Sequence, residues 1–513
     1  MHAPLRPLCT PLATVLAVLV LVAACGRGAG AASGTPVPDG ELRIAAQFSP
    51  RSGYAIDTDD AFILTQLGAT EALTSAAADG RVQPALAESW TQVDPLTWRF
   101  VLRSGVTFHD GTPLTPAAVV TALGHVAGVA APPRALRGLG LTVVEDGANA
   151  VRITTARPDP ILPQRMSSPN AAILASSAYT GGAPSVIGTG TGPMRLTAVE
   201  GTQRAVLERF DGYWGGRPAL ARVTATFVDD PAARALALRA GDVDIAQGLP
   251  ESSLLEFSAG SGFDEQTIAA PRTVSLLMNQ AAAPFSDVRI RQAVARAVDR
   301  TALAEQALAG SATPASELFG PAVAWGDRGP APAPDVEGAK ALLAQAGHGP
   351  DNPLHVRLWT YQNRPELPTL ATAVQAMLRD VGIDAEIQIG DYGAQEPDLL
   401  AGRYDMFILS RSYLTDVPDA GATLRSDYTC DGSYNIAHHC SQAFDSLVAG
   451  LDTTTDVAAR QEVFRAAARI LVDGAVGVPL VHSLENGVSR NVTGYTVDPM
   501  AKRLVTPQLA ITG

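Results

Sequence analysis

The sequence predicts an α/β protein with mixed sheets, because two kinds of apolar periodicity alternate along the chain. Segments such as 97–102 and 384–389 place apolar side chains at every second position, which is typical of half-buried strands. Other segments, such as 287–308 and 335–347, repeat apolar side chains at helical spacing, with Asp287 and Asp335 as N-caps. Alternation of the two patterns indicates helices that pack against sheets.

The N-terminus has the pattern of an export signal. Arg6 precedes an apolar run from Leu12 to Ala24, which is too short for a membrane span and ends in small residues. Residues 22–25, Val-Ala-Ala-Cys, resemble a bacterial lipobox, which predicts a signal peptide over 1–24 and a lipidated Cys25. An ordinary signal peptide cleaved elsewhere is the alternative. With the lipid, the protein is held at the cell membrane on its extracytoplasmic side.

A low-complexity stretch follows the signal. Residues 25–40 are rich in Gly, Ala, Ser and Pro without apolar periodicity, so they predict a flexible tether. The folded part then begins near Glu41, and the remaining chain is long enough for two or three lobes with their own cores. Only 17% of the residues are charged and the net charge is -13, which argues against a nucleic-acid partner.

Residues 98–123 have the pattern of strand, turn and helix. We expect a turn after Asp110 and a helix that begins at Pro116 behind a Thr115 cap. His109 and Asp110 then lie at the end of a hairpin. The sequence supplies no nucleophile or third ligand close to them, so the pair predicts a turn and not a catalytic site.

Two cysteines of the mature chain, Cys430 and Cys440, close a short loop. In an oxidising compartment this pair predicts a disulfide, for which chain entropy gives about 3 kcal/mol of stabilisation. A metal site that adds His438 and His439 to the cysteines is the alternative. Adjacent His-His-Cys side chains do not converge easily on one tetrahedral centre, so we expect no metal ligands and no cofactor.

Four segments carry motifs that occur together in one family: residues 84–115, 190–218, 234–246 and 284–300. They contain "TWRFVLRSGVTFHDGTPLT", "GTGP" with "DGYWGGRP", "AGDVDIA" and "DVRIRQAVARAVDR". In this order they resemble the family 5 extracellular solute-binding proteins, the peptide- and nickel-binding lipoproteins of bacterial ABC importers. The motifs are most similar to those of the dipeptide- and oligopeptide-binding members.

This resemblance implies a two-lobed, periplasmic-binding-protein-like fold with mixed sheets and an extra subdomain on the first lobe. It places lobe I at 41–274 with the subdomain at about 71–180, lobe II at 275–484, and a return to lobe I at 485–513. Such a protein closes on a ligand between its lobes, and a permease recognises the closed form. The resemblance therefore implies a monomer that is not an enzyme, with a short peptide and ABC permease subunits as partners.

The resemblance also points to a ligand site. Peptide-binding members carry an aromatic residue and, three positions later, an Asp that pairs with the peptide α-ammonium; these positions are Tyr413 and Asp416 here. The alternative is that Asp416 only caps the loop at Pro418. Dipeptide binders also have a Cys-to-Cys loop with an Asn that leads into Phe-Asp, matched here by Cys430, Asn435, Cys440, Phe444 and Asp445.

A second candidate for the ligand site is Arg364. It resembles the Arg-Pro segment that dipeptide binders use against the ligand carboxylate, and a guanidinium group suits bidentate carboxylate binding. We expect Tyr361 to line the same site. Glu366 stands where this segment normally has an aromatic residue, which indicates a different side-chain preference or a basic ligand. A solvated surface arginine is the alternative.

Two other functions compete with peptide binding. A nickel or metallophore binder belongs to the same family and is supported by the adjacent His438 and His439. An exported hydrolase needs a catalytic constellation, and the sequence shows no such set of residues. Peptide capture for an ABC permease is the favoured function.

Overall fold

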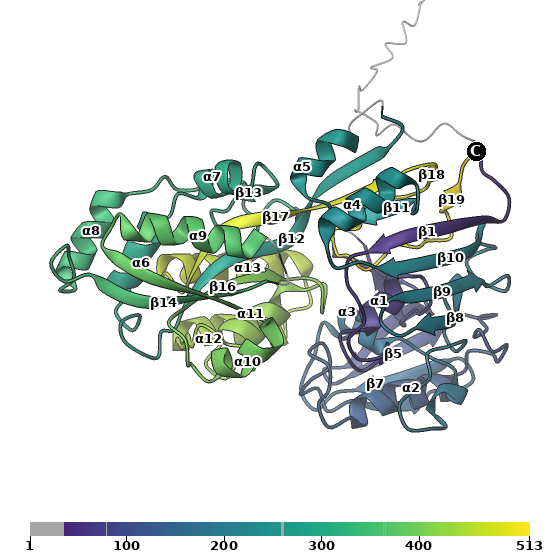
Figure 1. The fold of residues 1–513 in the computed structure, drawn as a ribbon. Coiled ribbons are helices and arrows are strands. Elements are labelled where there is room, and N and C mark those ends of the chain that lie inside the picture. The colour runs from purple at the N-terminus through teal and green to yellow at the C-terminus, as the bar shows by residue number, and fades with distance from the viewer. Residues whose placement is uncertain (1–34, 78–79, 258–260, 363, 365) are drawn as a thin grey trace, which may run out of the picture.

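The computed structural model describes residues 35–77, 80–257, 261–362, 364 and 366–513. The predicted signal peptide and Cys25 lie outside the described residues. Figure 1 shows two lobes, with the helices and strands between β12 and β17 in one lobe and the elements before and after them in the other. We call the lobe with the chain ends the first lobe, and the other the second lobe. This is the two-lobed α/β architecture with mixed sheets that the sequence predicts.

One mixed sheet runs through both lobes. Its strand order is β15-β14-β16-β12-β17-β11-β1-β10-β9-β8, and β13 pairs with β17 beside this path. Its strands are β1 (Gly40–Ala46), β8 (Met194–Glu200), β9 (Arg204–Arg209), β10 (Leu220–Phe227), β11 (Ile245–Gln247), β12 (Asp264–Met278), β13 (Ala312–Pro314), β14 (Leu354–Tyr361), β15 (Ile383–Gly390), β16 (Met406–Ser412) and β17 (Gly477–Ser489).

The long antiparallel strands β12 and β17 connect the lobes (Figure 1). The first part of β12 pairs with the end of β17, which in turn pairs with β11 of the first lobe. The last part of β12 pairs with β16 of the second lobe. The ladder is irregular between Ala269 and Thr273. Residues 275 and 485, where we expect the chain to cross, both lie in these strands, and the exact lobe boundaries stay a prediction.

The first lobe carries a smaller four-stranded antiparallel sheet of order β4-β5-β7-β6. Its core is a separate buried cluster that includes Phe100, Val119 and Val151. Helix α2 packs on it, begins at Pro116 as predicted, and is capped by the Thr115 hydroxyl, which accepts a hydrogen bond from the Ala118 amide at 3.3 Å. The elements are β4 (Ala87–Asp94), β5 (Thr97–Leu102), α2 (Pro116–Gly128), β6 (Thr142–Glu145) and β7 (Ala150–Thr154).

Among the described residues, no helix combines the length and apolar character that a bilayer crossing requires.

The remaining elements of the first lobe are short. These elements are α1 (Ala61–Gln66), β2 (Thr74–Ala76), β3 (Val82–Pro84), α3 (Leu162–Arg165), α4 (Pro231–Ala240), α5 (Glu251–Leu254), β18 (Val492–Thr493) and β19 (Ala510–Ile511).

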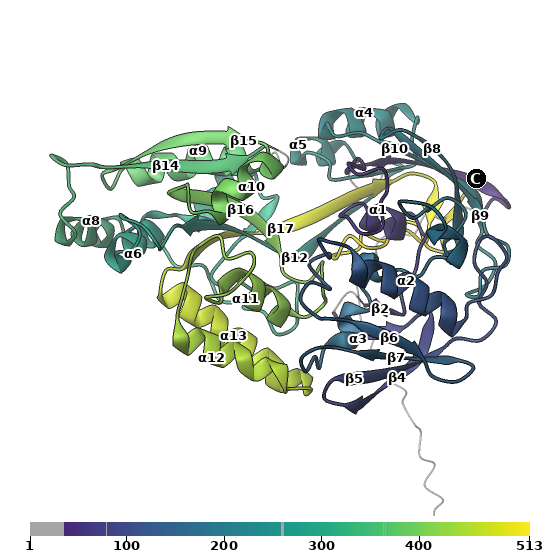
Figure 2. The ribbon, with the colours of Figure 1, turned by 90° about the horizontal axis from the view of Figure 1, so that it is seen from below.

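Helices cover the sheet of the second lobe. The predicted helix after Asp287 is shorter than its apolar pattern: it ends at Ala297, because the Asp299 carboxylate caps a new turn by accepting a hydrogen bond from the Ala302 amide at 3.0 Å. Figure 2 shows α11, α12 and α13 next to the small sheet of the first lobe. The helices are α6 (Val288–Ala297), α7 (Arg300–Ala302), α8 (Val336–Gln345), α9 (Glu366–Arg379), α10 (Tyr392–Leu400), α11 (Ala420–Tyr428), α12 (Gln442–Ala449) and α13 (Val457–Asp473).

Candidate ligand site between the lobes

Asp416 lies in the loop between β16 and α11, at the boundary between the lobes. Its Oδ2 atom is 3.5 Å from Nη1 of Arg411, in the second lobe, and 3.4 Å from Nε of Arg134, in the first. Its side chain is 35% exposed. Burial alone would raise the pKa of Asp416, but Arg134 and Arg411 outweigh it and hold the pKa below its usual range. The carboxylate is therefore ionised at neutral pH.

Arg134, in the loop after α2, reaches both lobes. It faces Asp416 on one side and the exposed Asp59 carboxylate of the first lobe, at 3.7 Å, on the other. Its guanidinium carbon is 5.7 Å from the centre of the Tyr434 ring in the second lobe. The ion pair and this cation-π contact therefore tie the lobes together beside Asp416.

Arg411, the cation of the second lobe beside Asp416, is already paired with another carboxylate. It makes a bidentate pair with the buried Asp427, with N–O distances of 2.7 and 3.1 Å. Its guanidinium carbon lies 4.9 Å from the centre of the Tyr434 ring. Because Asp427 already pairs with Arg411, the positive charge that acts on Asp416 comes chiefly from Arg134 of the first lobe.

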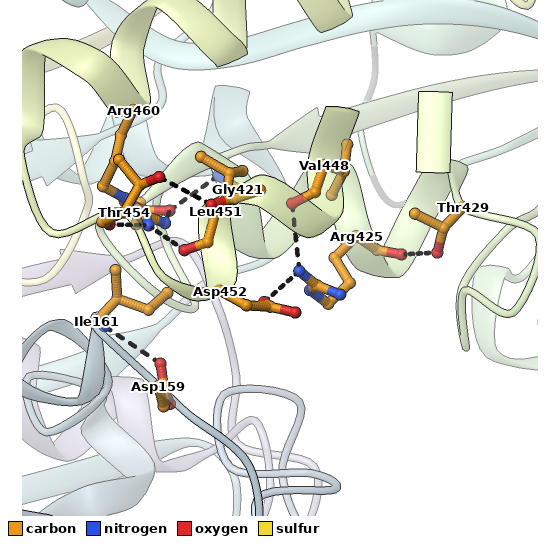
Figure 3. Close-up of polar contacts among 12 residues, drawn as sticks. Asp159, Ile161, Gly421, Arg425, Thr429, Val448, Leu451, Asp452, Thr454 and Arg460 are labelled. Atoms are coloured by element: carbon orange, nitrogen blue, oxygen red, sulfur yellow. Dashed lines mark hydrogen bonds and ion pairs between the residues drawn. The ribbon is translucent and has the colours of Figure 1, made fainter. Parts of the chain in front are cut away.

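The far end of the Asp416 loop is anchored by a buried ion pair. Asp419 accepts hydrogen bonds from Nε and Nη2 of Arg460 at 2.8 and 2.7 Å, and from the Gly421 amide. Figure 3 shows Arg460 from α13 also donating to the carbonyls of Leu451 and Thr454, at 2.7 and 2.8 Å. This network fixes the start of α11 and hence the position of the loop that carries Asp416.

Arg364 lies in a second charged cluster between the lobes. Its Nη1 atom is 3.6 Å from Oε1 of Glu366, and its guanidinium carbon is 6.0 Å from the ring centre of Phe48, which belongs to the first lobe. Burial works against its charge, but Glu366 and Glu485 outweigh it and raise the pKa of Arg364. The side chain is 15% exposed, so Arg364 is not a freely solvated arginine.

Glu366 is paired in this arrangement. Because it faces Arg364, it is not a free acidic group that awaits a basic ligand. Arg272, in β12, lies 3.9 Å from Glu485, in β17, and burial together with the neighbouring Arg364 lowers the pKa of Arg272 to about 10. Two arginines and two glutamates therefore lie close together where the connecting strands pass between the lobes.

The two tyrosines of the predicted site are more buried than its charged residues. The Tyr361 hydroxyl accepts a hydrogen bond from the Ser410 amide at 3.3 Å, and its ring lies 5.2 Å from that of Tyr392. Tyr413 is 2% exposed and packs edge-on against Phe319 with a centroid distance of 5.0 Å. Both rings shape the second lobe behind the charged groups, and direct ligand contact by either stays a prediction.

Cys430 and Cys440 lie at bonding distance, with their sulfur atoms 2.00 Å apart. Asn435 braces the loop between them by donating to the carbonyls of Thr429 and His439 at 2.9 and 2.6 Å. The Asp445 carboxylate accepts hydrogen bonds from the Cys430 amide. These residues of the predicted dipeptide-type pattern therefore hold the loop in shape.

The two histidines of this loop are engaged by backbone carbonyls. Nε2 of His438 lies 3.2 Å from the Leu399 oxygen, and Nδ1 of His439 lies 2.8 Å from the Tyr428 oxygen. Burial lowers the pKa of His439. Within the described ranges, no group of three or more His, Cys, Asp or Glu side chains is arranged to hold a metal ion.

His109 and Asp110 lie in a turn, as predicted, and face different partners. Nε2 of the buried His109 lies 2.9 Å from the Gly192 oxygen, and burial lowers the pKa of this ring to about 4. Asp110 accepts hydrogen bonds from the Thr112 amide at 2.9 Å and from the Ser177 hydroxyl at 2.6 Å. The local sequence does not predict the contact between Asp110 and Ser177. Asp110 does not pair with His109.

Sequence reasoning missed Arg134, Arg411, Tyr434 and the buried Lys502 of the C-terminal segment. Electrostatic attraction links Lys502 to Asp416. One feature of the sequence sets Lys502 apart: it is one of few lysines in a chain whose cationic residues are mostly arginines. No spacing rule connects residues so far apart in the sequence, so only the fold brings these groups together.

Comparisons with known proteins show the family to which this chain is related. The model described as "Bacterial extracellular solute-binding proteins, family 5 Middle" matches residues 81–435. The nickel-binding protein NikA of Staphylococcus aureus is 24% identical over 455 residues, which cover 88% of this chain and 89% of that relative. The glutathione-binding protein GsiB of Escherichia coli (strain K12) is 28% identical over 439 residues, covering 82% and 84%.

Solved structures agree with the family match. NikA from Brucella suis in complex with Fe(III)-EDTA superposes with a TM-score of 0.82 at 25% identity, over 92% of this chain and 100% of that one. DppA from Helicobacter pylori in complex with the peptide STSA gives a TM-score of 0.77 at 20% identity, over 92% and 98%. This chain belongs to the family 5 bacterial extracellular solute-binding proteins of ABC importers.

Proposed function

We propose that this protein captures short peptides between its lobes and delivers them to an ABC permease. The observation that carries the proposal is the ionised carboxylate of Asp416, which the second lobe presents to the first at the lobe boundary. A carboxylate in that position attracts the α-ammonium of a peptide. Arg364, in the second cluster, is then the group for a ligand carboxylate.

The mechanism is hinge closure. Ligand contacts from both lobes favour the closed state, and the connecting strands β12 and β17 are where the hinge lies. Because Arg134 already faces Asp416, the ligand ammonium takes over the place of that guanidinium. A charge-assisted hydrogen bond of this kind contributes about 1.5–3 kcal/mol.

The second candidate function is binding of a nickel or other metal chelate. It is favoured by the nickel-binding relative that this chain matches over 88% of its length. A chelate with free carboxylates would also suit the arginines between the lobes. The glutathione-binding relative favours the peptide function, because glutathione is itself a short peptide with an α-ammonium group.

We also propose the anchoring and organisation that the sequence predicts. Cys25 carries lipid and holds a monomer at the extracytoplasmic face of the membrane. Lobe I covers 41–274 and 485–513, and lobe II covers 275–484. The protein acts as a binding protein without catalysis, as the family to which it belongs suggests.

Calorimetry on the purified mature protein, stripped of bound ligand, tests the proposal. A panel of di- to tetrapeptides should bind, and N-acetylated copies of the same peptides should bind much more weakly because they lack the ammonium group. Binding of a nickel-histidine complex without binding of any peptide would instead establish the second candidate function.

A further inference from the structure

Lys502 is a buried ammonium group without a hydrogen-bond partner. Its residue is 5% exposed, and Nζ finds no acceptor anywhere in the described part of the chain. Burying an unsatisfied charge is unfavourable by several kcal/mol. Because Lys502 is nevertheless buried at the lobe boundary, a group on the ligand is a candidate for its missing partner.

The segment that carries Lys502 is held tightly between the lobes. The Asp498 carboxylate accepts hydrogen bonds from the amides of Met500, Lys502 and Arg503 at 3.0, 3.0 and 2.9 Å. Met500 packs into a buried cluster of the second lobe, together with Tyr413. Since backbone amides occupy both oxygens of Asp498, that carboxylate positions the loop and leaves Nζ unbonded.

Lys502 and Asp416 approach the boundary from opposite lobes. Each is among the groups that shift the other's protonation, so the ammonium lies in the electrostatic field of the carboxylate. Arg134 is the other cation that the first lobe directs at Asp416. Asp416 therefore faces two cations from the first lobe. Arg134 has a second carboxylate beside it, that of Asp59, whereas Nζ of Lys502 has no hydrogen-bond partner among the described residues.

We propose that Lys502 binds a carboxylate that the ligand carries next to its ammonium group. This inference rests on the proposed function, in which the ligand ammonium pairs with Asp416. When that ammonium replaces Arg134 beside Asp416, Arg134 keeps Asp59, but Lys502 then shares the charge of Asp416 with a bound cation and still has no acceptor. A carboxylate on the ligand, close to its ammonium, restores the balance of charge and gives Nζ an acceptor.

Two kinds of peptide carry this pair of groups. An N-terminal Asp or Glu places a side-chain carboxylate near the α-ammonium. A γ-glutamyl peptide instead carries a free α-carboxylate on the same carbon as the ammonium. The site therefore selects an acidic first residue, and not only a free N-terminus.

Calorimetry with two matched ligand pairs separates these sources. Glu-Ala is compared with Gln-Ala, and γ-Glu-Ala with the same peptide after conversion of its α-carboxylate to the amide. Wild-type protein should bind the acidic member about tenfold or more tightly in at least one pair. The pair that shows the preference identifies which carboxylate Lys502 binds.

The variant Lys502→Met removes the ammonium and keeps the length of the side chain. It should abolish the preference within the pair, measured as the ratio of the two Kd values in the same variant. The matched control is Lys340→Met on α8, where Lys340 pairs at the surface with Glu337, and it should keep the full preference. If Lys502→Met does not fold, Lys502→Gln and the wild-type comparison still decide.

The outcomes distinguish the two proposals. Equal affinity for acidic and neutral members in wild type overturns the role of Lys502 and leaves peptide binding standing. A preference that survives in Lys502→Met overturns it as well. Failure of these four peptides and of the whole di- to tetrapeptide panel to bind overturns the proposed function, and the role of Lys502 falls with it.

Discussion

Replacing Asp416 by Asn isolates the charge on which the proposed peptide site depends. Asn keeps the shape of the side chain but cannot pair with an ammonium group as a carboxylate does. The charge-assisted hydrogen bond contributes about 1.5–3 kcal/mol. Since each 1.4 kcal/mol is about a tenfold change in Kd, Asp416→Asn should weaken peptide binding by about ten- to a hundredfold.

The same change should have a small effect on the ligand-free protein. Asp416 is about one-third exposed, and its contacts with Arg134 and Arg411 are 3.4 and 3.5 Å long. Partly solvated ion pairs of this length contribute about 0–1 kcal/mol each. The free energy of unfolding should therefore fall by about 1 kcal/mol, while the added stability from bound peptide falls much more.

Calorimetry and thermal unfolding, with and without peptide, measure both effects. The matched control is Asp59→Asn, because Asp59 faces the other side of Arg134 and its side chain is 90% exposed. Asp59→Asn should bind peptide like wild type. Wild-type affinity in Asp416→Asn, or equal binding of acetylated and free peptides by the wild type, would rule out this role of Asp416.

The remaining predictions concern the anchor, the loop, the buried ion pair and Lys502. Cys25→Ala should release the protein into the medium; unchanged membrane association in fractionation would contradict lipidation. Thiol labelling of the unfolded, unreduced protein should detect neither Cys430 nor Cys440, whereas stoichiometric metal lost on mutating His438 and His439 would establish a metal site. Arg460→Met leaves Asp419 buried and unpaired, so urea unfolding should show a loss of about 3–5 kcal/mol, and a loss below about 1 kcal/mol would contradict the anchoring role. Burial lowers the pKa of Lys502 to about 8, below its unfolded value, so wild-type stability should rise relative to Lys502→Met as pH rises from 8 to about 10.5. Parallel pH profiles for the two proteins would contradict this burial.

The sequence predicted the elements whose signals are local. The Thr115 cap and the Asp335 cap both form where their residue types indicate. The helix after Asp287 was predicted too long, because apolar spacing continues past Ala297 although Asp299 starts a new turn. Periodicity reports which side chains face a core, and it does not report where the backbone changes direction.

The candidate site was only partly predictable. The motif pointed to Asp416 and Tyr413, but it does not report that the Tyr413 ring packs edge-on against Phe319. Arg134 and Lys502 are distant from Asp416 in the sequence and come from loops without a recognisable motif. The ion pair of Arg134 with Asp416 and the electrostatic attraction of Lys502 to it exist only because the two lobes meet.

In the proposed function, a short peptide with a free amino group occupies the space between the lobes. Mass spectrometry of ligand released by denaturing protein purified from its native membrane tests it most directly. We expect the released ligand to consist of short peptides, enriched in an acidic first residue. A released metal chelate, without peptide, would contradict the proposed function.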